Sequence, residues 1–108
     1  MPTAILFSPD LFIASQVAAQ LPPDWSLDQV ARAEELAPRA TEQQAALLLV
    51  DLGGVPTLDW DGIRAVRDRC PQLKVIAFGP HVQAGKLAEA KAAGCDVVLT
   101  RGQMLKEG

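Results

Sequence analysis

The chain has 108 residues and is too short for a second domain. Hydrophobic residues make up 49% of it, which is enough to bury one core without a metal or a disulfide. Its formal charge of −3 comes from residues scattered along the sequence, and without a cluster of Lys and Arg we expect no direct binding to nucleic acid or to an anionic membrane. The longest apolar run, residues 45–50, is far shorter than the roughly 20 residues of a membrane-spanning helix, and no secretory pattern opens the chain, so we expect one cytoplasmic domain over residues 1–108.

The first predicted elements are a strand at residues 3–7, a helix at about residues 9–20 and a strand at residues 25–30, which alternates with a period of two. Ser8 is a good N-cap for the helix, and Pro9 suits its first position. Apolar or small side chains recur in the helix at three- and four-residue spacing and predict the stripe that packs on a sheet: Leu11, Phe12, Ala14, Ser15, Val17, Ala18 and Leu21.

The middle of the chain predicts a second helix, a central strand and a third helix. Residues 32–44 have a helical composition, but Pro38 makes a short or interrupted helix the expectation. Residues 46–52 form a near-continuous apolar run, which is typical of a parallel strand covered on both faces. The third helix is expected to begin after the cap residue Asp59 and to end at Cys70.

A strand at residues 74–78, a helix that ends near Gly94 and a strand at residues 96–100 complete the alternation. Short connections with right-handed crossovers then predict a parallel five-stranded sheet with helices on both faces. Ligands of such sheets bind outside the carboxyl ends of the strands, which here fall at residues 8–10, 51–54, 78–81 and 100–102.

Three stretches make the chain resemble the receiver domains of bacterial response regulators: Leu-Leu-Val-Asp-Leu at residues 48–52, Asp61-Gly62, and Ala-Gly-Cys-Asp-Val-Val-Leu-Thr at residues 93–100. The resemblance implies a flavodoxin-like, doubly wound α/β sheet with strand order 2-1-3-4-5. Receiver domains usually end in a fifth helix across the last two strands. Residues 102–108 leave room for at most two turns, so we expect that helix to be short or absent.

The resemblance also implies roles for residues at the strand ends. Asp51 corresponds to the aspartate that accepts a phosphoryl group from a histidine kinase. The family's acidic pair, which helps to bind Mg²⁺, reads Pro9-Asp10 here, which leaves Asp10 and Asp51 as weak metal-ligand candidates. Gly79 replaces the switch Ser or Thr, and Arg101, in place of a lysine, is the candidate that would pair with a phosphate.

Other interpretations of these residues stay open. Asp10 also suits the positive end of the first helix, and Asp51 could accept hydrogen bonds from the loop amides of residues 53–54. If the register slips by one, Phe78 rather than Gly79 stands at the switch position. Because Mg²⁺ requires near-octahedral oxygen ligands and phosphoryl transfer requires cations, the loss of one carboxylate weakens such a site.

The remaining candidates for chemistry are few. Cys70 and Cys95 do not form a CxxC pair and His81 is the single histidine, so neither a zinc site nor a dithiol motif is indicated. We expect reduced, structural thiols, and a loop or helix-start position for His81.

The sequence therefore predicts a non-catalytic signalling module, a pseudo-receiver that is not an enzyme, requires no cofactor and binds a protein partner. Without a full fifth helix, half the side chains of residues 75–78 and 97–99 would face a poorly covered surface, which predicts docking of a partner or a homodimer there. The alternative is a phosphorylatable receiver of two-component signalling that uses Asp51, Asp10 and Arg101 with Mg²⁺. A small-ligand or enzymatic domain is a third interpretation, since this fold hosts many activities.

Overall fold

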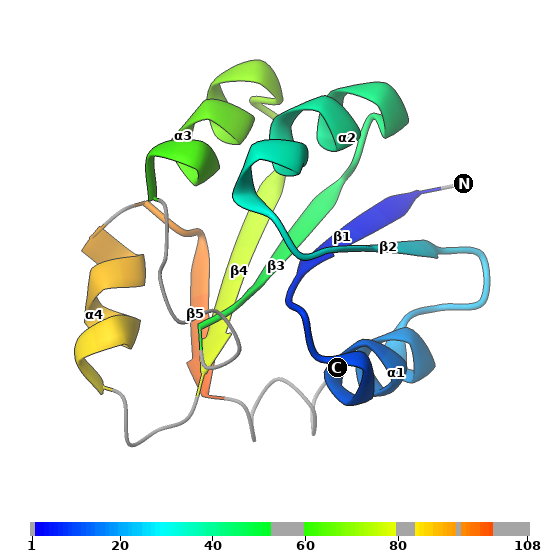
Figure 1. Cartoon of the computed structure of the whole chain (residues 1–108), viewed down its shortest axis with the longest axis horizontal. Coiled ribbons are helices and arrows are strands. Elements are labelled where there is room, and N and C mark those ends of the chain that lie inside the picture. The colour runs from blue at the N-terminus through cyan, green and yellow to red at the C-terminus, as the bar shows by residue number, and fades with distance from the viewer. Residues whose placement is uncertain (1, 53–59, 80–83, 93, 101–108) are drawn as a thin grey trace.

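The computed structural model describes residues 2–52, 60–79, 84–92 and 94–100. Figure 1 shows strands and helices that alternate along the chain. Their bounds are β1 (Thr3–Phe7), α1 (Leu11–Gln20), β2 (Ser26–Val30), a 3₁₀ turn (Ala33–Glu35), α2 (Leu36–Gln43), β3 (Leu47–Asp51), α3 (Trp60–Arg69), β4 (Lys74–Gly79), α4 (Ala84–Ala92) and β5 (Val97–Thr100). The five strands form a parallel sheet in the order β2-β1-β3-β4-β5, which confirms the predicted doubly wound arrangement.

Helices cover both faces of the sheet (Figure 1). On one face, Ile13 and Val17 of α1 form a buried cluster with Leu6, Leu49 and Phe78 of the sheet. On the other face, α2, α3 and α4 pack together with inward side chains of all five strands in a larger cluster. Among the described helices, α1 therefore lies alone on its face, and none of them is long and apolar enough to cross a membrane.

The central position of β3 explains its continuous apolar sequence. Leu48, Leu49 and Val50 are at most 1% exposed, because strands flank β3 on both sides and helices cover both of its faces. The register pairs Val50 with Phe7 of β1, and it pairs Asp51 with Phe78 of β4. The carboxyl ends of three neighbouring strands thus meet at Asp51.

Pro38 does not interrupt α2, which is short as expected. The helix begins at Leu36, so Pro38 lies in its first turn, where a backbone N–H has no acceptor within the helix and its loss costs little. The C-cap of the helix is Gln44, whose φ of 50° is left-handed, and the amide of Ala45 donates back to the carbonyl of Ala40.

The start of α1 differs from the prediction. The helix begins at Leu11, and its N-cap is Asp10 rather than Ser8. The Asp10 backbone is extended, and its Oδ1 accepts hydrogen bonds from the backbone N–H groups of Phe12 (2.8 Å) and Ile13 (3.3 Å). Ser8 does not cap the helix because its hydroxyl group binds another side chain, described below.

The predicted sheet-facing stripe of α1 is wrong in part, although its members Ala14 and Val17 do pack on the sheet. Ile13 and Val17 face the sheet and are at most 2% exposed. Several members of the predicted stripe face outward instead: Leu11 (76% exposed), Phe12 (67% exposed), Ser15 and Ala18. The seven predicted positions cover more than one side of a helix, and α1 has no charged residue to mark the outer side, so the spacing alone does not set the rotation of the helix.

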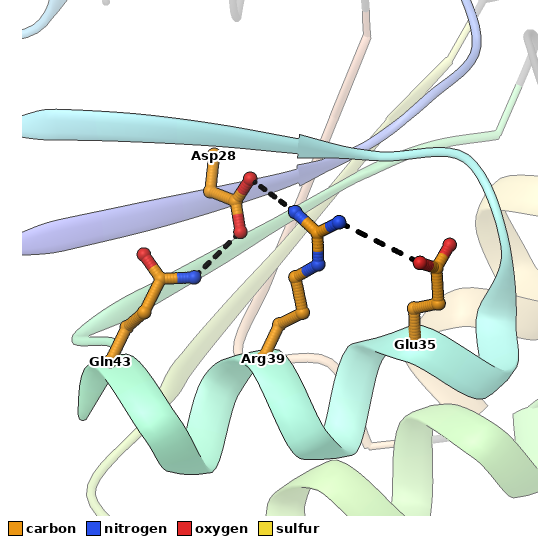
Figure 2. Close-up of polar contacts among 4 residues, drawn as sticks. All are labelled: Asp28, Glu35, Arg39 and Gln43. Atoms are coloured by element: carbon orange, nitrogen blue, oxygen red, sulfur yellow. Dashed lines mark hydrogen bonds and ion pairs between the residues drawn. The ribbon is translucent and has the colours of Figure 1, made fainter.

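The edge strand β2 is held to α2 by polar contacts (Figure 2). Asp28 of β2 accepts hydrogen bonds from Arg39 Nη1 (2.8 Å) and from Gln43 Nε2 (2.6 Å). Arg39 also forms an ion pair with Glu35, four residues earlier (3.6 Å). One carboxylate of the sheet thereby binds two successive turns of the helix that covers it.

Candidate functional site

Asp51 is the last residue of β3, and its side chain is fully buried. Burial of a carboxylate costs free energy unless hydrogen bonds replace the lost water. The hydroxyl group of Ser8 donates such a bond to Asp51 Oδ2 over 2.8 Å, across 43 residues of sequence. A buried serine and a buried aspartate thus join the ends of β1 and β3.

The surroundings of Ser8 fix its orientation. Its backbone N–H donates to the carbonyl of Val30 (3.0 Å), and its carbonyl accepts from Gln29 Nε2 (2.8 Å). Its hydroxyl oxygen also accepts from the backbone N–H of Asp10 (3.1 Å). A continuous path of hydrogen bonds therefore runs from Asp51 through Ser8 to the N-cap of α1.

Ser8 is the residue of this site that sequence reasoning missed, because it was interpreted only as a helix cap. The contact becomes evident only from the register of β1 and β3. Since Phe7 lies opposite Val50 in the parallel register, the next residue of each strand, Ser8 and Asp51, must be neighbours.

The structure gives Asp10 the second of its predicted roles, that of an acid at the start of the first helix. Its Oδ1 accepts two backbone N–H groups of α1, where the positive end of the helix favours a negative charge. It is the backbone of Asp10, not its carboxylate, that connects with Asp51, through the hydroxyl of Ser8.

The end of β4 provides no hydroxyl group beside Asp51. The residue paired with Asp51 is Phe78, which is fully buried, and the next residue, Gly79, has no side chain. Several other predicted positions lie outside the described residues: the phosphate-pairing candidate Arg101, the loop amides of residues 53–54, Asp59 and His81.

The described residues do not fit a Mg²⁺ site. No group of three or more His, Cys, Asp or Glu side chains gathers anywhere in the part of the chain that the structure describes. The Asp51 carboxylate is fully buried against the Ser8 hydroxyl, and the Asp10 carboxylate binds backbone amides of α1. Mg²⁺ instead requires several accessible oxygen ligands in an octahedron.

A second polar cluster lies at the opposite, amino-terminal edge of the sheet. Asp96 Oδ2 accepts the backbone N–H of Val75 (2.8 Å), and Arg67 of α3 binds both Asp96 (3.4 Å) and the carbonyl of Gly94. The Val75 amide, followed by Arg67, lowers the pKa of Asp96, whereas burial raises the pKa of the neighbouring Cys95 thiol. These contacts hold α3 against β4 and β5. An open cleft beside Arg67 lies at this edge of the sheet, away from Asp51.

No protein-family model matches the chain, and no curated protein matches it. Solved structures are similar to it over almost its whole length. A CheY-like protein (tadZ) from Pseudomonas aeruginosa has a TM-score of 0.81 at 18% identity. The match covers 99% of this chain and 92% of that protein's chain. The chain has the CheY-like receiver fold.

Two further receiver-fold structures give the same result. A response regulator from Thermotoga maritima has a TM-score of 0.79 at 18% identity, with 99% of this chain and 90% of that chain covered. The chemotaxis response regulator CheY4 of Vibrio cholerae has a TM-score of 0.77 at 16% identity, with 99% and 94% covered. At such low identities the likeness shows the receiver fold alone.

Proposed function

We propose that this chain is a non-catalytic, receiver-like signalling module that acts through protein–protein contacts and does not depend on phosphorylation. The observation that carries this proposal is the state of Asp51. Its carboxylate is fully buried and accepts the Ser8 hydroxyl, so an incoming phosphoryl donor does not meet an exposed nucleophile. Phosphoryl transfer depends above all on positioning, with the attacking oxygen in line with the leaving group.

We propose that a signalling protein docks on the α1 side of the sheet, where some side chains of β3, β4 and β5 stay half-buried. Leu47, Ile76, Val97 and Leu99 of β3, β4 and β5 are only half-buried, and all but Val97 belong to the cluster on this face. Because Val97 pairs with Ile76 and Leu99 with Phe78, these side chains form a continuous apolar row. Of the two β4 side chains on this face, Ile76 is half-buried and Phe78 is fully buried, so the exposure expected for strand 4 is found only at Ile76.

A phosphorylatable receiver is the second candidate. It is favoured by the position of Asp51 at the carboxyl end of the central strand, where ligands of doubly wound sheets bind. In that case a histidine kinase would be the partner, Mg²⁺ the cofactor, and Arg101 would pair with the phosphate. Both Ser8 and Asp10 would then have to give up their present hydrogen bonds.

Beryllium fluoride with Mg²⁺ separates the two candidates, because together they mimic a phosphoryl group on an aspartate. We expect the backbone amide resonances of Ser8 and Leu52 to stay in place during the titration, because Asp51 stays buried. An Asp51→Asn variant, which has no carboxylate for beryllium fluoride, is the matched control. Saturable shifts that are present in the native chain and lost in Asp51→Asn would reject the non-catalytic proposal.

A further inference from the structure

The outer face of α1 is an apolar surface in the described part of the chain. Leu11 and Phe12 are its large hydrophobic side chains, with exposures of 76% and 67%, and they lie together at the start of the helix. Farther along the same face the exposed residues are small: Ser15, Ala18 and Ala19. Large side chains at one end and small side chains at the other make this face uneven.

This pattern is complementary to itself. When two copies of α1 lie antiparallel about a two-fold axis at Ser15, residues equally far before and after Ser15 face each other. Leu11 then meets Ala19 of the second copy, and Phe12 meets its Ala18. A large residue opposes a small one at each of these positions, which lets the two helix axes approach to roughly 8–10 Å.

The distribution of charge favours the same contact. The formal charge of −3 repels a second copy in general, but α1 contains no charged residue, whereas α2, α3 and α4 each contain both acidic and basic residues. Apolar faces without like charges are the surfaces through which such copies can meet.

We propose that two copies of this chain associate through α1, antiparallel and about a two-fold axis at Ser15. Two Leu11 and two Phe12 side chains cover only several hundred Å² in total, less than the roughly 1,200–2,000 Å² typical of stable interfaces, so the dimer is weak and depends on concentration. The contact uses neither Asp51 nor the apolar row over β4 and β5, and it goes beyond the proposed function.

Sedimentation velocity over a range of chain concentrations tests the dimer. We expect Phe12→Glu and Ala18→Lys each to weaken self-association by about tenfold, because a charge then enters the apolar contact. A mixture of the two variants should associate again. In the mixed dimer the carboxylate introduced at position 12 of one copy would face the ammonium group introduced at position 18 of the other, while Phe12 and Ala18 meet at the second position. Both charges suit the helix end at which they are placed, so α1 should still form, which circular dichroism would verify.

Ala65→Glu on α3 and Ala88→Lys on α4 are the matched controls, because both positions are exposed on other helices. They should leave self-association unchanged. A native chain that stays monomeric up to about millimolar concentration would overturn the proposal. So would a dimer that persists in both α1 variants, or a mixture of the two variants that fails to associate.

Discussion

Ser8 links the two strands that carry the candidate site, and its hydroxyl is the donor seen on the buried Asp51 Oδ2. Replacement of Ser8 by Ala leaves that oxygen without this donor in a site that water does not reach. We expect the free energy of unfolding in urea to fall by about 1–3 kcal/mol. Ser15→Ala is the control, because Ser15 is exposed on α1, and it should change stability by less than about 0.5 kcal/mol. Equal effects of the two substitutions would contradict the role given to Ser8.

The lowered pKa of Asp96 predicts that the stability of the fold depends on pH in the acid range. Its pKa is lower in the folded chain than the ordinary value of 3.8, first because it accepts the Val75 amide and then because Arg67 is near. The stabilisation is therefore complete above the ordinary pKa and is lost as the pH falls through the lower, folded value. Asp96→Asn should flatten the decline of the thermal midpoint below about pH 4, measured by circular dichroism, whereas the exposed Asp24→Asn should leave that decline as it is.

Sequence reasoning located Asp51 but not its partner. The apolar run and the strand-end position are local signals, so they are visible in a short stretch of sequence. The bond between Ser8 and Asp51 depends on the register of two strands 43 residues apart, which no local pattern reports.

At the level of elements, the Asp10 carboxylate caps α1, and the same carboxylate would be needed to bind a metal ion. Asp10→Ala should lower the free energy of unfolding by about 1 kcal/mol, while Asp10→Asn should keep most of it, because the amide oxygen of Asn can still accept the N–H groups of Phe12 and Ile13. Urea unfolding of the two variants measures the difference. A large loss in Asp10→Asn that appears only when Mg²⁺ is present would instead indicate a metal ligand.

The contacts between β2 and α2 predict a local effect. Arg39→Met removes the charge that binds Asp28 and Glu35 while keeping most of the aliphatic side chain (Figure 2). We expect faster hydrogen exchange at the amides of β2 and unchanged exchange at those of β4. Uniformly faster exchange in both strands would show that the contact stabilises the whole sheet rather than its edge.

The order and type of the elements could be predicted because composition and spacing change at each boundary. The rotation of α1 could not. A helix without charges offers two apolar sides, and the choice between them depends on how Ile13 and Val17 fit Leu6 and Leu49 of the sheet, which is a matter of packing.

At the scale of the whole molecule, the two cysteines belong to one buried layer. Cys70 is 7% exposed, Cys95 packs against the same cluster, and burial raises the pKa of Cys95. The raised pKa leaves little thiolate at Cys95 at neutral pH, and burial limits access to Cys70. We therefore expect alkylation by iodoacetamide to be slow in the folded chain and fast in urea. Mass spectrometry of timed samples measures both rates, and rapid labelling of the folded chain would contradict this packing.

The strand order has a consequence for synthesis on the ribosome. β1 pairs only with β2 and β3, so every partner of the first strand is complete once the first 51 residues have emerged. At that point the outer edge of β3, with Leu48 and Val50 along it, has no strand beside it until β4 follows more than 20 residues later. An unpaired apolar edge is a template for aggregation, so the nascent chain is most vulnerable in the interval between β3 and β4.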